Sequence, residues 1–515
     1  MLSQLGCIYN LAWFTFMKCQ TLPLAVPSQL EAPEIAGIEP VLGTEAARIL
    51  EAGLLGQLIA SLGSPLNVLF PERVTQNVSP FLETFEHYGI DGKVFFTTKP
   101  NRSSSIIREI ACSSAVGVDV SSEGSLAAAL SAGVPSSRIE ATGPKDQGYL
   151  SLALLQGIVI NVDDLAEIDL ICALKRKLGI SKKTQILVRL SGFKSPRSTF
   201  AVSDGTFGVS TDTIAELWPK LNSHSQEVDL LGFSYHLNTD SIEYRVLALE
   251  QTLSILFAAK QKGFAPRVVN IGGGFRIRYA KNPAEWENFI LRLKGSVTGQ
   301  GDACTWNRSG LGFSTENGRI KGSPRFMDHA EPLPPADQLC ALLRQELPSF
   351  SGVAAGRLLS ESVLELWIEP GRAMLDQAGL TVAEVLHVRT SEQGHPLLVL
   401  RMNRSNLNSF ELTLLTDPIL LPSNPNPAPC EHGYFLTGNL CVANELLTPR
   451  LIRFGRHVSP GDLIAFVNTA PYIMDFAESP TLHQPVARKI AVWFRGHKDM
   501  WALDEEYRPY LKEEK

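Results

Sequence analysis

The 515-residue sequence lacks several patterns that mark specialised classes of protein. Its eight cysteines are scattered without a CxxC pair, which argues against structural zinc and a disulfide framework and fits a reducing cytoplasm. The ten histidines show no HExxH or comparable ligand spacing. No apolar run reaches the length of a membrane span, and no basic stripe indicates nucleic-acid binding. We therefore expect a cytoplasmic protein without a metal, membrane or nucleic-acid partner.

Eight apolar, strand-like segments alternate with helix-like segments between residues 94 and 370. The strand candidates are 94–98, 116–120, 139–143, 158–161, 186–190, 230–236, 268–273 and 365–370. The intervening segments 121–133 and 163–179 end in glycine, as helices often do. Alternating strands and helices predict parallel βαβ units, and eight of them predict a closed (β/α)₈ barrel. An open, doubly wound sheet is the alternative, because spacing alone does not show closure.

The alternation of strand-like and helix-like segments does not extend to the rest of the chain. Residues 281 to about 360 contain glycine and proline with little clear periodicity, so we expect an inserted lid or subdomain. After residue 380 the strand-like segments predict an all-β domain. We therefore divide the chain into an N-terminal extension with strands that contribute to the β domain (1–62), a barrel (63–379) and a C-terminal β domain (380–515). The mildly apolar start lacks a basic region and is interpreted as an extension rather than a signal peptide.

Residues that can carry chemistry lie near the C-terminal ends of the predicted strands, where barrels place functional groups. Lys99 follows the first strand and either reaches solvent or acts chemically. His236 ends the sixth, where a satisfied core histidine is the plainer interpretation. "NIGGGF" (270–275) allows backbone N–H groups to approach a phosphate, although a tight turn explains a lone glycine triplet equally. "EPGR" (369–372) adds an acid and a guanidinium. A lysine, a stacking ring, a phosphate cradle and an anion-binding arginine together suggest pyridoxal phosphate.

In these motifs the sequence resembles the fold-type III pyridoxal-phosphate decarboxylases, which include diaminopimelate, ornithine and arginine decarboxylases. The similarity runs from about residue 63 to about residue 501 and is interrupted by the 281–360 insertion. It implies a barrel of the alanine racemase type with a C-terminal β domain, pyridoxal 5'-phosphate as cofactor and an amino-acid substrate. It also implies a homodimer with shared active sites.

The resemblance implies roles for individual residues. Lys99 matches the Schiff-base lysine, and we expect burial to lower its pKa so that it leaves as a neutral amine. Cys441 matches a proton donor that enters the neighbouring subunit's site. Glu369 would keep the pyridine nitrogen protonated, and His236 would stack on the ring. The other implied cofactor-binding residues are Asp119, Arg189 near the ring oxygen, and Thr239, Gly272, Gly273, Gly274, Arg372 and Tyr472 around the phosphate.

One departure bears on the substrate. Val442 stands where relatives carry an acidic residue that grips the substrate's distal amine. Glu445 remains close by and could partly substitute for it. We therefore expect an amino-acid decarboxylase, diaminopimelate-like in its motifs, with the substrate open. Two alternatives are an amino-acid racemase or epimerase on the same fold, against which Glu369 argues, and a catalytically silent relative that binds a protein partner.

Overall fold

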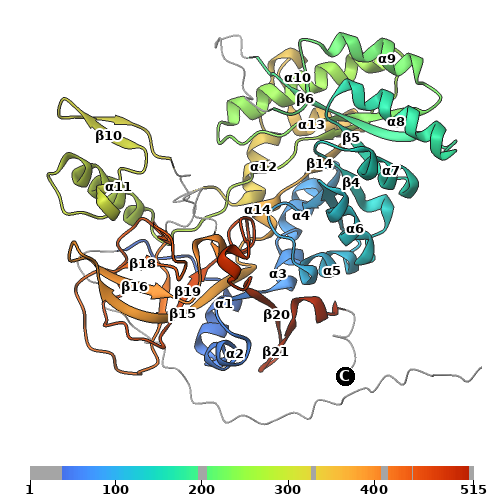
Figure 1. The fold of residues 1–515 in the computed structure, drawn as a ribbon. Coiled ribbons are helices and arrows are strands. Elements are labelled where there is room, and N and C mark those ends of the chain that lie inside the picture. Colours follow the sequence, from blue (N-terminus) through green and yellow to red (C-terminus); the bar gives the residue numbers. More distant parts are fainter. Residues whose placement is uncertain (1–36, 195–205, 326–331, 408–415, 444, 510–515) are drawn as a thin grey trace, which may run out of the picture.

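A computed structural model describes residues 37–194, 206–325, 332–407, 416–443 and 445–509. Its larger sheet is a closed parallel barrel (Figure 1), because β5 pairs with β6 and β14 with β2. The barrel strands are β2 (Asp91–Thr97), β3 (Val116–Val120), β4 (Ile139–Ala141), β5 (Val159–Val162), β6 (Thr184–Ser191), β8 (Val228–Ser234), β9 (Val268–Asn270) and β14 (Glu365–Ile368). All eight predicted strands overlap these elements, so the barrel is confirmed and the open sheet is wrong. A short strand, β7 (Val209–Ser210), extends the sheet beside β6.

Helices cover the outside of the barrel. They are α4 (Ser79–Tyr88), α5 (Ser104–Cys112), α6 (Glu123–Ser131), α7 (Gln147–Gln156), α8 (Leu165–Leu178), α9 (Leu217–Ser223) and α10 (Ile242–Gln261). Local sequence signals set their ends. The Asp164 carboxylate accepts a 2.7 Å hydrogen bond from the Ala166 N–H and so caps α8, which ends at Gly179 with a left-handed φ of 69°. On α10, Leu249 and Leu253 lie one turn apart and are both buried.

Inside the barrel, β2 and β14 change from apolar to polar side chains toward their C-terminal ends. Phe95 and Trp367 belong to a small apolar cluster, with ring centroids 4.8 Å apart. Two residues after Trp367, Glu369 lines a cavity, and two residues after Phe95, Thr97 does the same. Side chains two apart on a strand point to the same face. The apolar cluster therefore forms the floor on which the polar residues of the site rest.

The second sheet forms the β domain and joins distant parts of the chain. Its strands are β1 (Leu66–Leu69), β15 (Gly379–Thr390), β16 (Pro396–Leu400), β17 (Ile419–Leu421), β18 (Phe435–Thr437), β19 (Leu463–Val467), β20 (Arg488–Arg495) and β21 (Lys498–Leu503). β1 pairs antiparallel with β15 and parallel with β20. The expected barrel start at residue 63 is therefore wrong for this strand. A fully buried strand has the same apolar sequence pattern in either sheet, so only its pairing partners show to which sheet it belongs.

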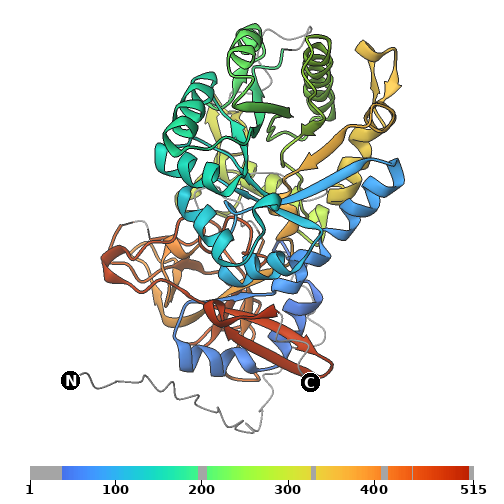
Figure 2. The same ribbon diagram turned by 90° about the vertical axis from the view of Figure 1, so that its right-hand side faces the viewer.

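The segment before β1 also differs from expectation. Its described part forms helices α1 (Thr44–Glu51) and α2 (Leu54–Leu62) instead of strands, and the rest of the predicted extension lies outside the described residues. These helices lie beside β20 and β21 (Figure 2). Arg48 of α1 forms a 2.6 Å ion pair with Asp499 and stacks over Phe494. Ile49 and Leu58 complete an apolar core with Leu66 of β1.

The inserted region has two parts. The first contains α11 (Pro283–Thr298), β10 (Phe313–Glu316) and β11 (Arg319–Gly322), and it packs on the β domain. Trp306 makes an edge contact with Phe435 of β18, and Leu451 N–H donates to the Cys304 carbonyl at 3.0 Å. The second part returns to the barrel as α12 (Pro335–Leu343) and α13 (Ala355–Glu361). Among the described helices, none has the length and apolarity needed to cross a membrane.

Candidate active site

A cavity of about 300 Å³ lies at the C-terminal ends of the barrel strands, where the β domain meets the barrel. Tyr472 and Phe476 reach it from the loop after β19, so both domains build its wall. The predicted residues that line it are Lys99, Asp119, Arg189, His236, Gly274, Glu369, Arg372 and Tyr472. These residues are separated by up to 373 positions in sequence. The barrel residues meet because the strands that carry them are parallel, and Tyr472 joins them because the loop after β19 packs against the barrel.

Two carboxyl groups stand in this cavity beside cations. Asp119 is 4% exposed, and burial raises its pKa, although the Thr142 hydroxyl donates to it at 2.5 Å. Burial, followed by the nearby Asp119, raises the pKa of Glu369 to about 8. The charges of Lys99 and Arg189 act in the opposite direction on both acids. The protein alone therefore leaves the charge of Glu369 poorly compensated near neutral pH.

A hydrogen-bonded chain supports Glu369 from below. The Asn270 amide donates to Oε1 of Glu369 at 2.7 Å and to Oε2 of Glu140 at 3.0 Å. Glu140 is fully buried and also accepts from Asn161 at 2.7 Å, whose own Oδ1 accepts from the Ser234 hydroxyl. Burial and the neighbouring Glu369 raise the pKa of Glu140 well above its usual value. This network fixes the position of the Glu369 carboxyl.

His236 faces the cavity with an uncharged ring. The Gly273 N–H donates to Nδ1 of His236 at 3.2 Å, so Nδ1 is the acceptor and the ring proton sits on Nε2. Desolvation by the surrounding protein, followed by the charges of Arg189 and Lys99, lowers its pKa to about 4. Its side chain is nevertheless open to the cavity. A flat neutral ring is thus held at the position predicted for stacking.

The glycine triplet is needed for close approach of the backbone. A Cβ on Gly273 would lie 2.5 Å from the Glu369 carbonyl oxygen, and one on Gly272, whose φ is 65°, would lie 2.6 Å from the Tyr235 carbonyl oxygen. Neither contact is compatible with a side chain. The triplet therefore brings the ends of β8, β9 and β14 together, and its third member, Gly274, lines the cavity.

Arg372, which also lines the cavity, is held by aromatic residues. Its Nη1 donates to the Tyr279 hydroxyl at 2.9 Å, and its guanidinium lies 5.0 Å from the ring centroid of Tyr472. Tyr472 has a left-handed φ of 65° and donates its N–H to the Pro100 carbonyl at 2.9 Å. The segment that follows Lys99 is thereby tied to the β domain at the cavity.

Comparison with known proteins identifies the family. The model described as "Pyridoxal-dependent decarboxylase, pyridoxal binding domain" matches residues 72–320. The chain is 28% identical over 464 residues to an uncharacterized protein of Sinorhizobium fredii, y4yA, covering 88% of this chain and 94% of that one. It is 24% identical over 339 residues to diaminopimelate decarboxylase of Bacillus methanolicus, covering 64% and 66%. The crystal structure of diaminopimelate decarboxylase from Methanocaldococcus jannaschii with L-lysine has the same fold, with a TM-score of 0.63, 18% identity and coverage of 87% and 91%.

The chain is a pyridoxal-phosphate-dependent decarboxylase, and its residues 72–320 are similar to the pyridoxal-binding domain of the fold-type III enzymes. Its cofactor is therefore pyridoxal phosphate, and its class of enzyme is a carboxy-lyase that acts on amino acids.

The cavity of this decarboxylase fits the cofactor chemically. Glu369 is a carboxyl of raised pKa in need of a cationic or proton-sharing partner, which a pyridine nitrogen supplies. Lys99 offers an amine at the mouth, and Arg372 offers a cation for a phosphate. One expectation is corrected: Lys99 is exposed rather than buried in the single chain, because it stands beyond the last residue of β2.

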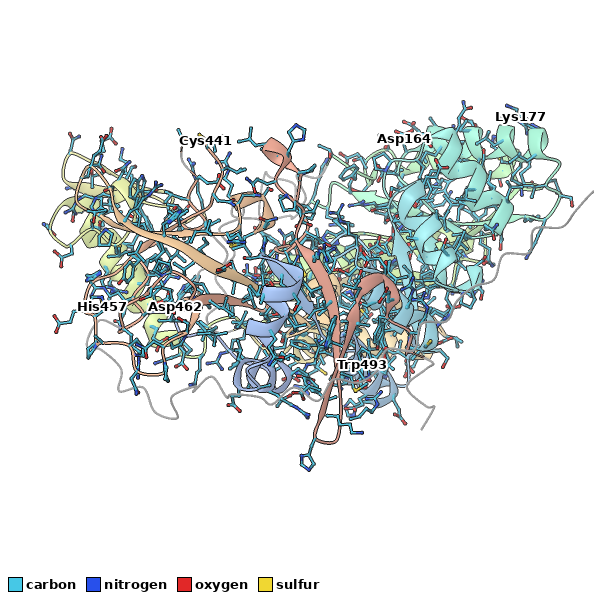
Figure 3. The ribbon with its side chains drawn as sticks, turned by 60° about the horizontal axis from the view of Figure 1, so that its bottom comes forward. Asp164, Lys177, Cys441, His457, Asp462 and Trp493 are labelled. Atoms are coloured by element: carbon cyan, nitrogen blue, oxygen red, sulfur yellow. The ribbon has the colours of Figure 1, made fainter. Side chains whose placement is uncertain are left out.

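Several predicted residues of the decarboxylase lie elsewhere. Thr239 lines a second, adjacent cavity, and its Oγ1 accepts from the Ser241 N–H. Cys441 and Val442 are exposed on the β domain, and Figure 3 places Cys441 well away from Asp164 and Lys177 of barrel helix α8. Their predicted approach to a neighbouring subunit stays a prediction.

Glu445 does not reach the cavity of its own chain either. It is 7% exposed, accepts a 2.8 Å hydrogen bond from the Arg404 N–H, and faces into the β domain. Its suggested role toward a substrate amine stays a prediction.

The sequence did not reveal the hydrogen-bonded network beneath Glu369. Glu140, Asn161 and Ser234 each sit within a predicted strand, and Asn270 begins the glycine motif. A signal was present, since an acid in the short strand "IEA" is costly to bury unless it serves a partner. The partner is another strand's residue, which the sequence alone does not reveal.

Proposed function

We propose that Lys99, His236, Glu369 and Arg372 hold pyridoxal phosphate and that Cys441 supplies the proton which completes decarboxylation of an amino acid. The observation that carries this proposal is the convergence of eight predicted cofactor residues on one cavity. When bound, pyridoxal phosphate links to the substrate's amino group and accepts the electron pair that carbon dioxide leaves behind.

Each residue then has a task that follows from its setting. Lys99 is the amine that would bind the cofactor aldehyde. Glu369, fixed by Asn270, holds a proton at the pyridine nitrogen. Neutral His236 presents a flat face without adding charge. Arg372 binds phosphate oxygens, and its tie to Tyr279 keeps the guanidinium in place. The Cys441 thiol, from a second chain, protonates the α-carbon.

We propose an amino acid with a distal carboxylate as substrate. A second cavity of about 350 Å³ adjoins the first, and Arg276 lines both. Arg276 pairs with Asp240 at this boundary and is a suitable cation for a carboxylate at the far end of a substrate. Val442, in contrast, offers no charge for a distal amine. The named relatives that act on diaminopimelate, which has such a carboxylate, support this choice.

The proposal also places the enzyme as a homodimer in the cytoplasm. Cys441 is exposed, and Val442 is 44% exposed. Both lie outside the cavity of their own chain, as expected for groups that complete a partner's site. The cytoplasmic location rests on the scattered cysteines of the sequence.

The decisive experiment incubates the cofactor-loaded enzyme in heavy water with diaminopimelate, ornithine, arginine, lysine and neutral or acidic analogues. Mass spectrometry should find a product that lacks carbon dioxide and carries one deuterium at the α-carbon, with the dicarboxylic substrate preferred. Deuterium uptake without loss of carbon would instead show racemisation, and a preference for ornithine would overturn the substrate class alone.

The role of Lys99 is tested in parallel by borohydride reduction followed by peptide mapping. The cofactor should be found on Lys99, and Lys99→Ala should lose both the adduct and turnover. Lys93→Ala is the matched control, because Lys93 lies at the opposite end of the same strand in a pair with Glu365. A cofactor adduct retained in Lys99→Ala would contradict the assignment.

A further inference from the structure

A cluster of metal-ligating side chains lies in the β domain, outside the active site. Sγ of Cys430 is 3.1 Å from Nδ1 and 3.4 Å from Nε2 of His432. His457 completes the group, and one ligand atom from each of the three residues lies within 4.8 Å of the others. The structure points to a zinc-class metal site, and we propose that Cys430, His432 and His457 bind one divalent zinc ion per chain.

The backbone positions these ligands independently of any ion. Cys430 N–H donates to the Gly455 carbonyl at 3.1 Å, and His457 N–H donates to the Ala428 carbonyl at 2.8 Å. The two segments are thus joined as an antiparallel bridge between Pro429 and Arg456. Cys430 and His457 are therefore held on adjacent segments, with His432 two residues further along. An ion bound there would cross-link these two segments, which contain little regular strand.

The donor set suits zinc better than a hard cation. One thiol and two imidazoles are ligands for Zn²⁺, whereas Ca²⁺ and Mg²⁺ require oxygen. Tetrahedral zinc with bonds of about 2.3 Å to sulfur and about 2.0 Å to nitrogen separates such ligands by about 3.6 Å. The separations between Cys430 and His432 are already close to that value, and the His457 ligand atom lies within 4.8 Å of the other two. These three ligands leave a fourth position for water.

The exposure of the cluster to solvent also favours a metal site. Cys430 is 7% exposed, while both histidines are exposed, so an ion can enter from solvent. The hydroxyl of buried Tyr434 lies 3.6 Å from Sγ. None of the three residues lines the catalytic cavity, and Figure 3 places His457 on the β domain, far from Lys177 of barrel helix α8.

A second Cys–His–Glu group on the barrel does not carry the same inference. Its His224 already lies 3.0 Å from Asp169, and its Glu227 is paired with Arg176 at 2.6 Å. Those ion pairs occupy the ligands. The Cys430 group differs because, within the described residues, its histidine rings have no carboxylate partner. The sequence shows no local spacing motif for this group, since the third residue comes from a segment 25 residues away.

The test uses the full-length, cofactor-loaded enzyme dialysed against a weak chelator and then loaded with Zn²⁺. Metal analysis should find one zinc per chain, and Cys430→Ser and His457→Ala should each weaken binding by at least about 100-fold, more than the cost of losing an outer-shell contact. Cys112→Ser and His497→Ala change an exposed cysteine and an exposed histidine and should retain it.

A spectroscopic readout keeps the test independent of variant folding. Co²⁺ added to the enzyme in a Cys441→Ala background should produce thiolate-to-cobalt charge-transfer absorption that Zn²⁺ abolishes. Wild-type protein that binds no zinc above the level of His457→Ala, or a cobalt complex without thiolate absorption, would overturn the proposal. Neither result affects the assignment of the catalytic cavity, which is tested by other residues.

Discussion

The Asn270 side-chain amide donates a 2.7 Å hydrogen bond to Oε1 of Glu369, the carboxyl assigned to the pyridine nitrogen. The same amide binds Glu140, and the Asn270 Oδ1 accepts from the Gly272 N–H at 2.9 Å. All polar atoms of this one amide are therefore engaged. It joins the acid of the site, a buried acid beneath it and the first glycine of the triplet into one rigid unit.

This arrangement predicts different outcomes for two substitutions of Glu140. Glu140→Ala removes the acceptor of Asn161 and of Asn270 and leaves buried amide donors unpaired, which costs about 1–3 kcal/mol for each group. Glu140→Gln keeps an acceptor oxygen and the side-chain volume, so it should cost much less. Urea unfolding of the two variants measures the difference. Equal losses would contradict this prediction, because they would show that keeping the volume and one acceptor oxygen does not preserve the network.

The raised pKa of Glu369 predicts a pH dependence of stability in the cofactor-free chain. Folding raises this pKa from 4.5 to about 8, so between these values the folded chain holds a proton that the unfolded chain has lost. The free energy of unfolding should therefore fall as pH rises through this window. Glu369→Gln should reduce the difference in urea midpoint between pH 6 and pH 8, while Glu51→Gln, at an exposed position, should leave it unchanged.

Gly273 provides a test of the close backbone approach. In Gly273→Ala the new Cβ would meet the Glu369 carbonyl oxygen at 2.5 Å, so the ends of β9 and β14 must separate. We expect a loss of about 1–3 kcal/mol in stability and weaker cofactor binding, because the N–H that orients His236 moves too. Spectroscopic titration with pyridoxal phosphate measures the affinity.

Gly295→Ala is the matched control for that substitution. Gly295 lies within α11 with open space around the added Cβ, so alanine should raise stability by up to about 1 kcal/mol. Unchanged cofactor affinity in both variants would contradict the importance of the triplet for the site.

Shared active sites predict complementation between two inactive variants. If Cys441 serves the neighbouring chain, a mixed dimer of Lys99→Ala and Cys441→Ala chains contains one site with both residues intact. Cys441→Ala alone should lower turnover by about 10²–10⁴-fold and keep the cofactor, and mixing should restore activity. Lys99→Ala mixed with Glu369→Gln should show no recovery, since both residues belong to the same cavity. Absence of recovery in the first mixture, with mixed dimers present, would contradict an active site shared between two chains.

The sequence predicted the residues of the site better than the buried hydrogen bonds that hold them in place. Lys99, Glu369 and His236 follow strand ends, and parallel strands bring such ends to one face, so their convergence was predictable. The bond from Asn270 to Glu140 was not, because it joins residues 130 positions apart on different strands. The same limit explains β1, whose four buried residues fit either sheet.

What the sequence determined by itself was the alternation of strands and helices and the chemistry at the strand ends, because both arise from local patterns of side chains. Only the tertiary structure decided which sheet received β1, where the insertion packed, and which buried acid lies beneath Glu369. It also brought Cys430 and His457 together across two paired segments. Those outcomes depend on contacts between distant segments, whose energies are set by packing and pairing rather than by any local pattern.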